Sequence, residues 1–201
     1  MEKQLIITVG REFGSAGHEI AEKLADKLGI DFIDRNLLKD IATLKNLDHE
    51  VLEKYDEKPI RWFFSRTVRD HSNSIEENIA QLQFNYLKEL AHEGKSFVVV
   101  GRCAENVLQA CPNMVSLFIL GDMECKIKRT MEVYSLSRNK AMEKIRRHDK
   151  SRKKYHNDHC GGKKWGDSRN YEICINSSKL GVEKTVDYLY NYITQRYEQM
   201  H

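Results

Sequence analysis

The sequence predicts an α/β fold in which helices cover both faces of a parallel sheet, and three observations support this. Short apolar runs alternate with helical patterns along the 201-residue chain. Several of these runs are apolar at nearly every position, as strands covered on both faces require. A strand, a loop, a helix and a second strand follow one another at the start of the chain, which favours a parallel crossover unit.

Five strands and three well-marked helices are predicted. The strands occupy residues 5–9, 30–33, 97–100, 115–120 and 171–175. Apolar residues recur at spacings of three and four over residues 20–28, which predicts a helix that stops at Gly29. A second helix is expected over residues 75–94, and a last one from near Gly181 to close the core.

The composition indicates one globular domain with two insertions. A length of 201 residues with 40% hydrophobic and 31% charged residues suits a single core. Residues 36–94 interrupt the pattern with a helical insertion, and residues 138–169 do so with twelve Lys or Arg against four Asp or Glu. This basic segment has a net charge of +8 and the whole chain only +3, so positive charge is concentrated there. The core then comprises residues 1–35, 95–137 and 170–201.

Neither a membrane span nor an export signal is predicted. No apolar stretch approaches the roughly 20 residues that a span requires, and the first residues lack the pattern of a signal peptide. We therefore expect a cytoplasmic protein. Its five cysteines form no C-x-x-C pair, which fits reduced thiols. His156, His159 and Cys160 are metal-ligand types, but the sequence offers no second ligand pair, which disfavours zinc.

A glycine-rich stretch, "VGREFGSAGHEI" at residues 9–20, lies between the first strand and the first helix. A loop in this place offers unpaired backbone N–H groups and the positive end of a helix dipole to an anion. Small residues let the backbone approach a phosphate closely. The candidate phosphate-binding residues are Gly10, Gly14, Ser15, Ala16, Gly17 and His18. The alternative is a tight turn that binds nothing.

This loop lacks the lysine and hydroxyl residue that end a Walker motif, Gly-Lys-Ser/Thr. Gly17 stands at the lysine position when the following helix is aligned. Arg11 is the candidate replacement, and Glu12 either orients it or binds a metal ion. The alternative is that Arg11 and Glu12 form an ordinary surface ion pair. Asp34 and Arg35 follow the second strand at its carboxyl end, where α/β sheets bind ligands, so they are candidate acceptor-binding residues.

Six segments in this order resemble one known family. They are "ITVGREFGSAGHEIAEKLADKLG", "FID", "VVVGRCAENVL", "SLFILGDMECKIKRTME", "DKSRKKY" and "INSSKLGVEKTV". The chain resembles the cytidylate kinase-like proteins, a branch of the P-loop nucleoside monophosphate kinases, over nearly its whole length. The resemblance implies a three-layer P-loop kinase fold with a five-stranded parallel sheet, and ATP and Mg²⁺ as cofactors. It also implies that residues 36–94 are a substrate-binding insert and residues 138–169 a lid.

The resemblance also implies roles for five residues. Arg102 is similar to an arginine that contacts the acceptor phosphate, although Cys103 follows it where cytidylate kinases have an aspartate. Arg129 is similar to an arginine that stacks on the nucleotide base; the alternative is a solvated helix face. Arg147, Asp149 and Arg152 resemble the catalytic set that neutralises the transferring phosphoryl group. Cations around that group are what phosphoryl transfer requires.

The function that these features favour is an ATP-dependent kinase that transfers a phosphoryl group to a small acceptor, such as a nucleoside monophosphate. Two alternatives belong to other classes. The missing Walker residues favour a nucleotide-binding regulatory protein without catalysis. The basic segment, with Tyr155 and Trp165 nearby, would suit an RNA-binding protein. The sequence does not identify the acceptor or the oligomeric state.

Overall fold

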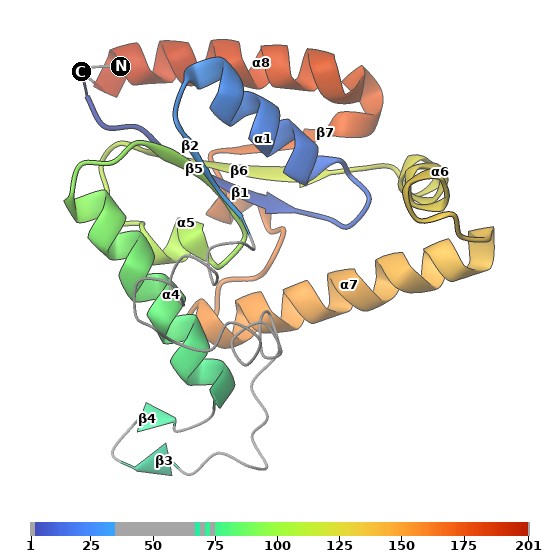
Figure 1. Ribbon diagram of the computed structural model, residues 1–201, viewed down its shortest axis with the longest axis horizontal. Coiled ribbons are helices and arrows are strands. Elements are labelled where there is room, and N and C mark those ends of the chain that lie inside the picture. The colour runs from blue at the N-terminus through green and yellow to red at the C-terminus, as the bar shows by residue number, and fades with distance from the viewer. Residues whose placement is uncertain (1–2, 35–66, 69–70, 73–74, 201) are drawn as a thin grey trace.

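The computed structural model describes residues 3–34, 67–68, 71–72 and 75–200, and it contains a five-stranded parallel sheet (Figure 1). The strand order is β2-β5-β1-β6-β7, and all four neighbouring pairs are parallel. The strands are β1 (Ile6–Arg11), β2 (Asp31–Ile33), β5 (Phe97–Val100), β6 (Met114–Leu120) and β7 (Ile173–Asn176). All five predicted strands are therefore confirmed. Two further short strands, β3 (Thr67–Val68) and β4 (His71–Ser72), pair antiparallel outside this sheet.

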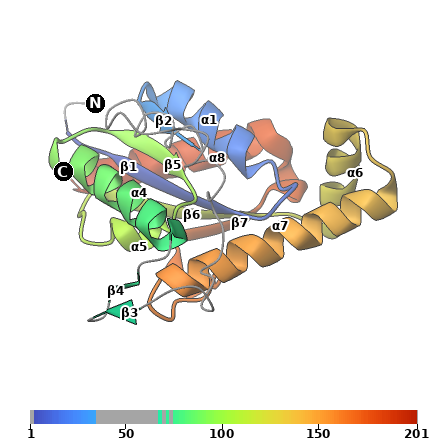
Figure 2. The ribbon, with the colours of Figure 1, turned by 60° about the horizontal axis from the view of Figure 1, so that its bottom comes forward.

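Helices cover both faces of the sheet, as predicted. The α-helices of the described residues are α1 (Gly17–Leu28), α4 (Ile75–His92), α5 (Ala104–Val107), α6 (Met123–Tyr134), α7 (Arg138–His159) and α8 (Ser177–Met200). Helices α1 and α8 lie on one face, whereas α4 and α5 lie on the other (Figures 1 and 2). Helix α6 stands at one end of the sheet, and α7 runs from it back toward α4. None of the described helices combines the length and the apolar content that a bilayer crossing requires.

The two largest apolar clusters of the described residues lie one on each face of the sheet. Successive strand side chains point to opposite faces, so Ile7 packs with α1 and α8 while its neighbour Ile6 packs with α4 and α5. Both residues are fully buried. This is why the strands read as continuous apolar runs in the sequence.

Glycine residues end one helix and kink another. Helix α1 stops at Gly29, as predicted, where φ is 66° and the backbone N–H reaches the carbonyl groups of Ala25 and Asp26. Gly181, with φ of 74°, kinks α8, so a turn of helix from Ser177 precedes the helix that was expected to begin near Gly181. Of the expected insertion, residues 36–66, 69–70 and 73–74 lie outside the described residues.

Candidate functional site

The glycine-rich loop, residues 10–17, connects the carboxyl end of β1 to the first turn of α1. The Ser15 hydroxyl donates to the Glu12 carbonyl at 2.9 Å, and the Ser177 hydroxyl donates to the Ser15 carbonyl at 2.7 Å. Ala16 takes a left-handed conformation with φ of 61° just before the helix starts. The loop is thus a compact turn held by one contact within it and one from α8, with the N-terminus of a helix at its end. The six predicted phosphate-binding residues follow one another from the end of β1, which contains Gly10, through this turn to the start of α1.

Arg11 occupies the space that a side chain at position 17 would need. A Cβ atom built on Gly17 would lie 2.6 Å from the Cβ atom of Arg11 and 3.2 Å from that of Ile119. Real Cβ atoms essentially never approach so closely, so in this loop conformation residue 17 has to be glycine. An arginine at position 11 and a Walker lysine at position 17 therefore exclude each other here.

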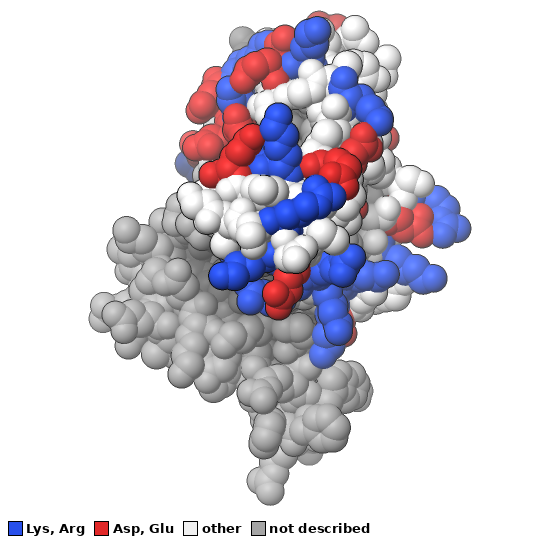
Figure 3. Space-filling view, turned by 90° about the vertical axis from the view of Figure 1, so that its right-hand side faces the viewer, with Lys and Arg blue, Asp and Glu red and all other residues white. Residues whose placement is uncertain are grey.

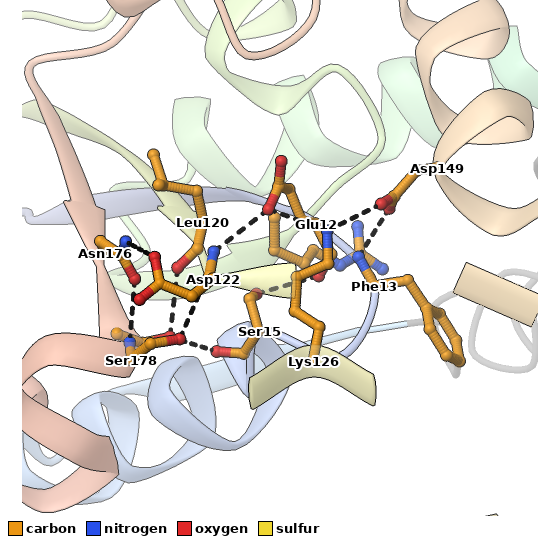
Figure 4. A network of polar contacts seen from close by, with 12 residues as sticks. Glu12, Phe13, Ser15, Leu120, Asp122, Lys126, Asp149, Asn176 and Ser178 are labelled. Atoms are coloured by element: carbon orange, nitrogen blue, oxygen red, sulfur yellow. Dashed lines mark hydrogen bonds and ion pairs between the residues drawn. The ribbon is translucent and has the colours of Figure 1, made fainter. Parts of the chain in front are cut away.

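A lysine reaches the loop from another element. Lys126 lies in the first turn of α6, and its side chain is only 4% exposed. Its ammonium Nζ lies 3.0 Å from Glu12 Oε2 and 3.2 Å from Asp149 Oδ2 (Figure 4). Burying an ammonium group is costly unless it is paired, and here two carboxylates pair it. Sequence reasoning missed this residue, although it stands in the segment "KIKRTME" in which Arg129 was singled out.

Asp149 brings a carboxylate from α7 onto the loop. Its Oδ1 accepts the backbone N–H of Phe13 at 2.6 Å, while its Oδ2 accepts the Lys126 ammonium (Figure 4). A backbone N–H of such a loop, together with an ammonium group, is a pair of donors that would suit a phosphate oxygen. The carboxylate thus occupies an anion position.

Glu12 faces the same lysine from the loop side. Its Oε2 accepts the Gly121 backbone N–H at 3.1 Å as well as the Lys126 ammonium. Glu12 and Asp149 therefore present oxygen atoms on two sides of one cation. Carboxylate oxygens are the ligands that Mg²⁺ prefers, so the donor set fits that ion once the ammonium group moves away.

Phe13 forms the apolar part of the contact between the loop and α7. Its ring stacks on His148 with centroids 4.4 Å apart and on Tyr134 at 5.8 Å. The Arg152 guanidinium carbon lies 5.6 Å from the same ring centroid, and Arg152 Nη1 makes a long contact of 3.4 Å with the Arg11 carbonyl. Arg152 Nε is buried, and no hydrogen-bond partner for it is found among the described residues.

The predicted catalytic set is only partly brought together. Asp149 and Arg152 contact the loop, but Arg147 is exposed and lies with Arg146 and Lys150 on another surface of α7. The reason is helical geometry, because residues two and five positions apart differ by about 200° and 140° around a helix axis of 3.6 residues per turn. In this conformation Arg147 does not face the loop.

A small pocket adjoins the loop at the carboxyl ends of β1 and β5. Arg11, Arg102 and Arg152 line it, together with the aromatic residues Tyr155, Trp165 and Tyr171. Arg102 is 2% exposed, and burial is the first of the causes that raise the pKa of the Tyr171 hydroxyl. The cavity measures about 30 Å³, which is room for about one water molecule. Three cationic side chains therefore line a pocket with little free space in this structure, and Glu105 and His156 line it as well.

The other predicted residues lie around this centre. His18 Nε2 lies 2.9 Å from Asp34 Oδ2, so a predicted phosphate-binding residue and a predicted acceptor-binding residue are in contact. Arg35 lies outside the described residues. Arg129 Nη2 donates to Glu19 Oε2 at 2.6 Å on the half-exposed surface between α6 and α1.

The face that carries α6 displays charges of both signs. Acidic and basic side chains are interspersed on it, so it is not a continuous basic surface (Figure 3). Nucleic-acid backbones are typically bound by grooves of one sign. This face therefore gives no support to the RNA-binding alternative.

Comparisons with known proteins agree with the fold and point to a family. The sequence profile of the cytidylate kinase-like family matches residues 6–179. The crystal structure of an uncharacterized protein from Eubacterium ventriosum ATCC 27560 is 38% identical, covers 95% of this chain and 99% of its own, and has a TM-score of 0.75. None of the curated proteins matches the chain.

Shikimate kinases share the fold at low sequence identity. The enzyme from Bacteroides thetaiotaomicron is 14% identical with a TM-score of 0.56, covering 94% of this chain and 98% of its own. The enzyme from Acinetobacter baumannii, whose structure is a complex with shikimate, is 14% identical with a TM-score of 0.53, covering 97% and 95%. These likenesses confirm the predicted three-layer P-loop kinase fold.

Proposed function

The chain belongs to the cytidylate kinase-like family, and from this premise we propose that it is a phosphotransferase that moves the γ-phosphoryl group of ATP to a nucleoside monophosphate. One observation carries the proposal. Cationic side chains from four separate elements, namely Arg11, Arg102, Lys126 and Arg152, converge on the glycine-rich loop and the adjoining pocket. Phosphoryl transfer depends on such preorganised cations, because the protein has little covalent chemistry to perform.

On the donor side, the loop would hold the ATP phosphates through backbone N–H groups. Lys126 takes the part of the absent Walker lysine, because its ammonium lies at the loop while position 17 cannot hold a side chain. A phosphate would replace the Asp149 carboxylate at the Phe13 N–H and the Lys126 ammonium. Like charges disfavour both anions at one position, so ATP binding has to displace Asp149.

Mg²⁺ would be held by Glu12 and by the displaced Asp149, whose carboxylates already flank the loop cation. When bound, this ion supplies neutralising charge for the phosphate oxygens. Lys126 would then turn from the carboxylates to the phosphates. The side chains around the loop and the pocket would orient the phosphates and exclude water from the site.

On the acceptor side, Arg102 would bind the acceptor phosphate, and Asp34 with His18 would meet the acceptor at the end of β2. A ligand of nucleotide size needs a pocket of about 300 Å³ or more, and the present cavity measures about 30 Å³. The basic segment, residues 138–169, is therefore proposed to be a lid that is closed here and opens by movement of α7. The insert, residues 36–94, would contribute acceptor specificity.

The test is ADP formation by the full chain with ATP and Mg²⁺, measured separately with CMP, UMP, AMP, GMP and shikimate. We expect one nucleoside monophosphate to stimulate ADP formation, and Arg152→Ala to abolish it. Arg146→Ala, an exposed arginine on the same helix, is the matched control and should leave the rate unchanged.

Each of the other outcomes identifies another function. If shikimate alone stimulates ADP formation, the acceptor is a hydroxylated acid and not a nucleoside monophosphate. Tight ATP binding without product would favour the regulatory nucleotide-binding protein. Binding of single-stranded RNA with a steep salt dependence, and no response to ATP, would favour the RNA-binding protein.

A further inference from the structure

A buried cluster of metal-ligand side chains forms part of the wall of the arginine-lined pocket. It consists of Glu105 in α5, His156 in α7 and Cys160 directly after α7, which are 6%, 4% and 1% exposed. One ligand atom from each of the three lies within 4.8 Å of the other two. Cys103, also buried at 4% exposure, stands two residues before Glu105 in the turn after β5. Such groups need partners when they are buried, because unpaired polar atoms are costly there.

The imidazole of His156 has the orientation of a metal ligand. Its Nε2 lies 2.6 Å from Glu105 Oε1. Its Nδ1 is buried and has no hydrogen-bond partner among the residues that the structure describes. In metal sites one ring nitrogen of a histidine binds the ion, while the other donates to a carboxylate that fixes the ring. His156 and Glu105 reproduce this arrangement, with Nδ1 as the nitrogen left for an ion.

The Cys160 sulfur belongs to this group, and Cys103 packs in the same buried cluster as Cys160. Cys160 follows His156 by four residues, and its backbone N–H donates to the His156 carbonyl at 2.9 Å, which continues the helical turn. A cysteine binds a metal ion as the thiolate, so the Cys160 thiol would lose its proton when the ion binds. The sequence alone offered His156, His159 and Cys160 near the end of α7, and the fold adds Glu105 and Cys103 from a distant segment.

We propose that His156 and Cys160, together with Cys103, which packs in the same buried cluster as Cys160, bind one Zn²⁺ ion, with Glu105 as the carboxylate that orients His156. Two thiolates and one imidazole suit zinc better than Mg²⁺ or Ca²⁺, which prefer oxygen ligands. Cys103 and His156 line the pocket that contains Arg102, so the ion would lie beside the proposed acceptor-phosphate site. An ion there would tie the C-terminal end of α7 to the turn after β5, next to Arg102.

The experiment uses the reduced full chain, with zinc content measured by mass spectrometry and Co²⁺ titration as the optical probe. We expect about one Zn²⁺ per chain, and with Co²⁺ a thiolate charge-transfer band and the d–d bands of tetrahedral cobalt. Cys103→Ser and Cys160→Ser should each abolish the charge-transfer band or sharply weaken it. Cys125→Ser, which removes an exposed thiol, should leave it unchanged.

Two results would overturn the proposal. One is folded wild-type protein that takes up neither Zn²⁺ nor Co²⁺, which would make the cluster a buried ion pair with a thiol beside it. The other is Co²⁺ binding that survives in folded Cys160→Ser or is lost in Cys125→Ser, which would mark adventitious binding. If a serine variant fails to fold, two measurements on the wild-type protein test the proposal instead. They are its zinc content and the fall in its melting temperature when a chelator is added. All these readouts are independent of phosphotransferase activity.

Discussion

The carboxylate of Asp149 lies 2.6 Å from the backbone nitrogen of Phe13, so an acidic side chain of α7 occupies an N–H group of the glycine-rich loop. The same carboxylate contacts the Lys126 ammonium. Together these contacts hold the basic helix on the loop. An incoming phosphate has to compete with this internal anion for both donors.

Asp149→Asn should therefore strengthen binding of ADP in the absence of Mg²⁺. The amide keeps the shape of the side chain but removes the charge that competes for Lys126, and we expect an about tenfold lower Kd, equivalent to about 1.4 kcal/mol. Isothermal titration calorimetry measures this. Asp158→Asn makes the same charge change at an exposed position of α7 and is the control. An unchanged or higher Kd for Asp149→Asn would show that the carboxylate does not compete with phosphate.

Lys126→Met should lower the kcat/KM for ATP by about 10²- to 10³-fold, the effect of removing one preorganised charge donor. Lys128→Met removes an exposed lysine of the same helix and should change little. Because methionine leaves the Glu12 and Asp149 carboxylates without their cation, folding is checked by circular dichroism. Lys126→Arg keeps the charge and should recover part of the rate. Full activity of a folded Lys126→Met variant would remove this lysine from the mechanism.

The strands, α1 and the loop were predictable because they depend on local patterns. Residues 97–100 are apolar on both faces, and the register of β5 with β1 buries all four of them. The stop of α1 at Gly29 follows from the positive φ that this glycine takes. These features need no knowledge of distant residues.

Lys126 was not predictable because its role arises from tertiary packing. Nothing in its local sequence distinguishes it from Lys128 or Arg129, and only the docking of α6 on the loop buries it. Likewise, the sequence does not tell which of the charged residues of α7 face the loop, since that depends on how the helix is rotated about its axis. Asp149 faces it and Arg147 does not.

Gly17→Ala should destabilise the fold by about 1–3 kcal/mol, the usual effect of overpacking. Gly17 is the first residue of α1, where alanine suits the backbone, so the cost comes from the collision with the Arg11 Cβ atom. Urea denaturation measures the change. In an Arg11→Gly background the same substitution should cost at least about 0.5 kcal/mol less, because the colliding atom is gone. Equal costs in both backgrounds would contradict the steric explanation.

Asp122→Asn should remove the part of the unfolding free energy that depends on the ionised Asp122 carboxylate. The Lys179 ammonium, and then the Asn176 amide, lower the pKa of Asp122, which precedes α6. A carboxyl whose pKa is lowered in the folded state stabilises it above the pKa of the unfolded chain and loses this contribution as the pH falls through the folded value. The difference in unfolding free energy between wild type and Asp122→Asn should hence be constant from pH 7 to about pH 5 and shrink below about pH 4. A difference that persists at low pH would mean that the charge is not its cause.

Phe13→Ala should release α7 from the loop. The ring is 9% exposed and lies between Tyr134 and His148, with the Arg152 guanidinium over it, so its truncation removes the apolar contact that supports the Asp149 hydrogen bond. We expect faster amide hydrogen exchange in α7, measured by mass spectrometry, while β1 and β6 keep their protection. Phe13→Leu retains most of the apolar contact and should behave like wild type. Unchanged exchange in α7 of the alanine variant would mean that the Asp149 contacts alone hold the helix on the loop, whereas faster exchange in every strand would indicate global destabilisation.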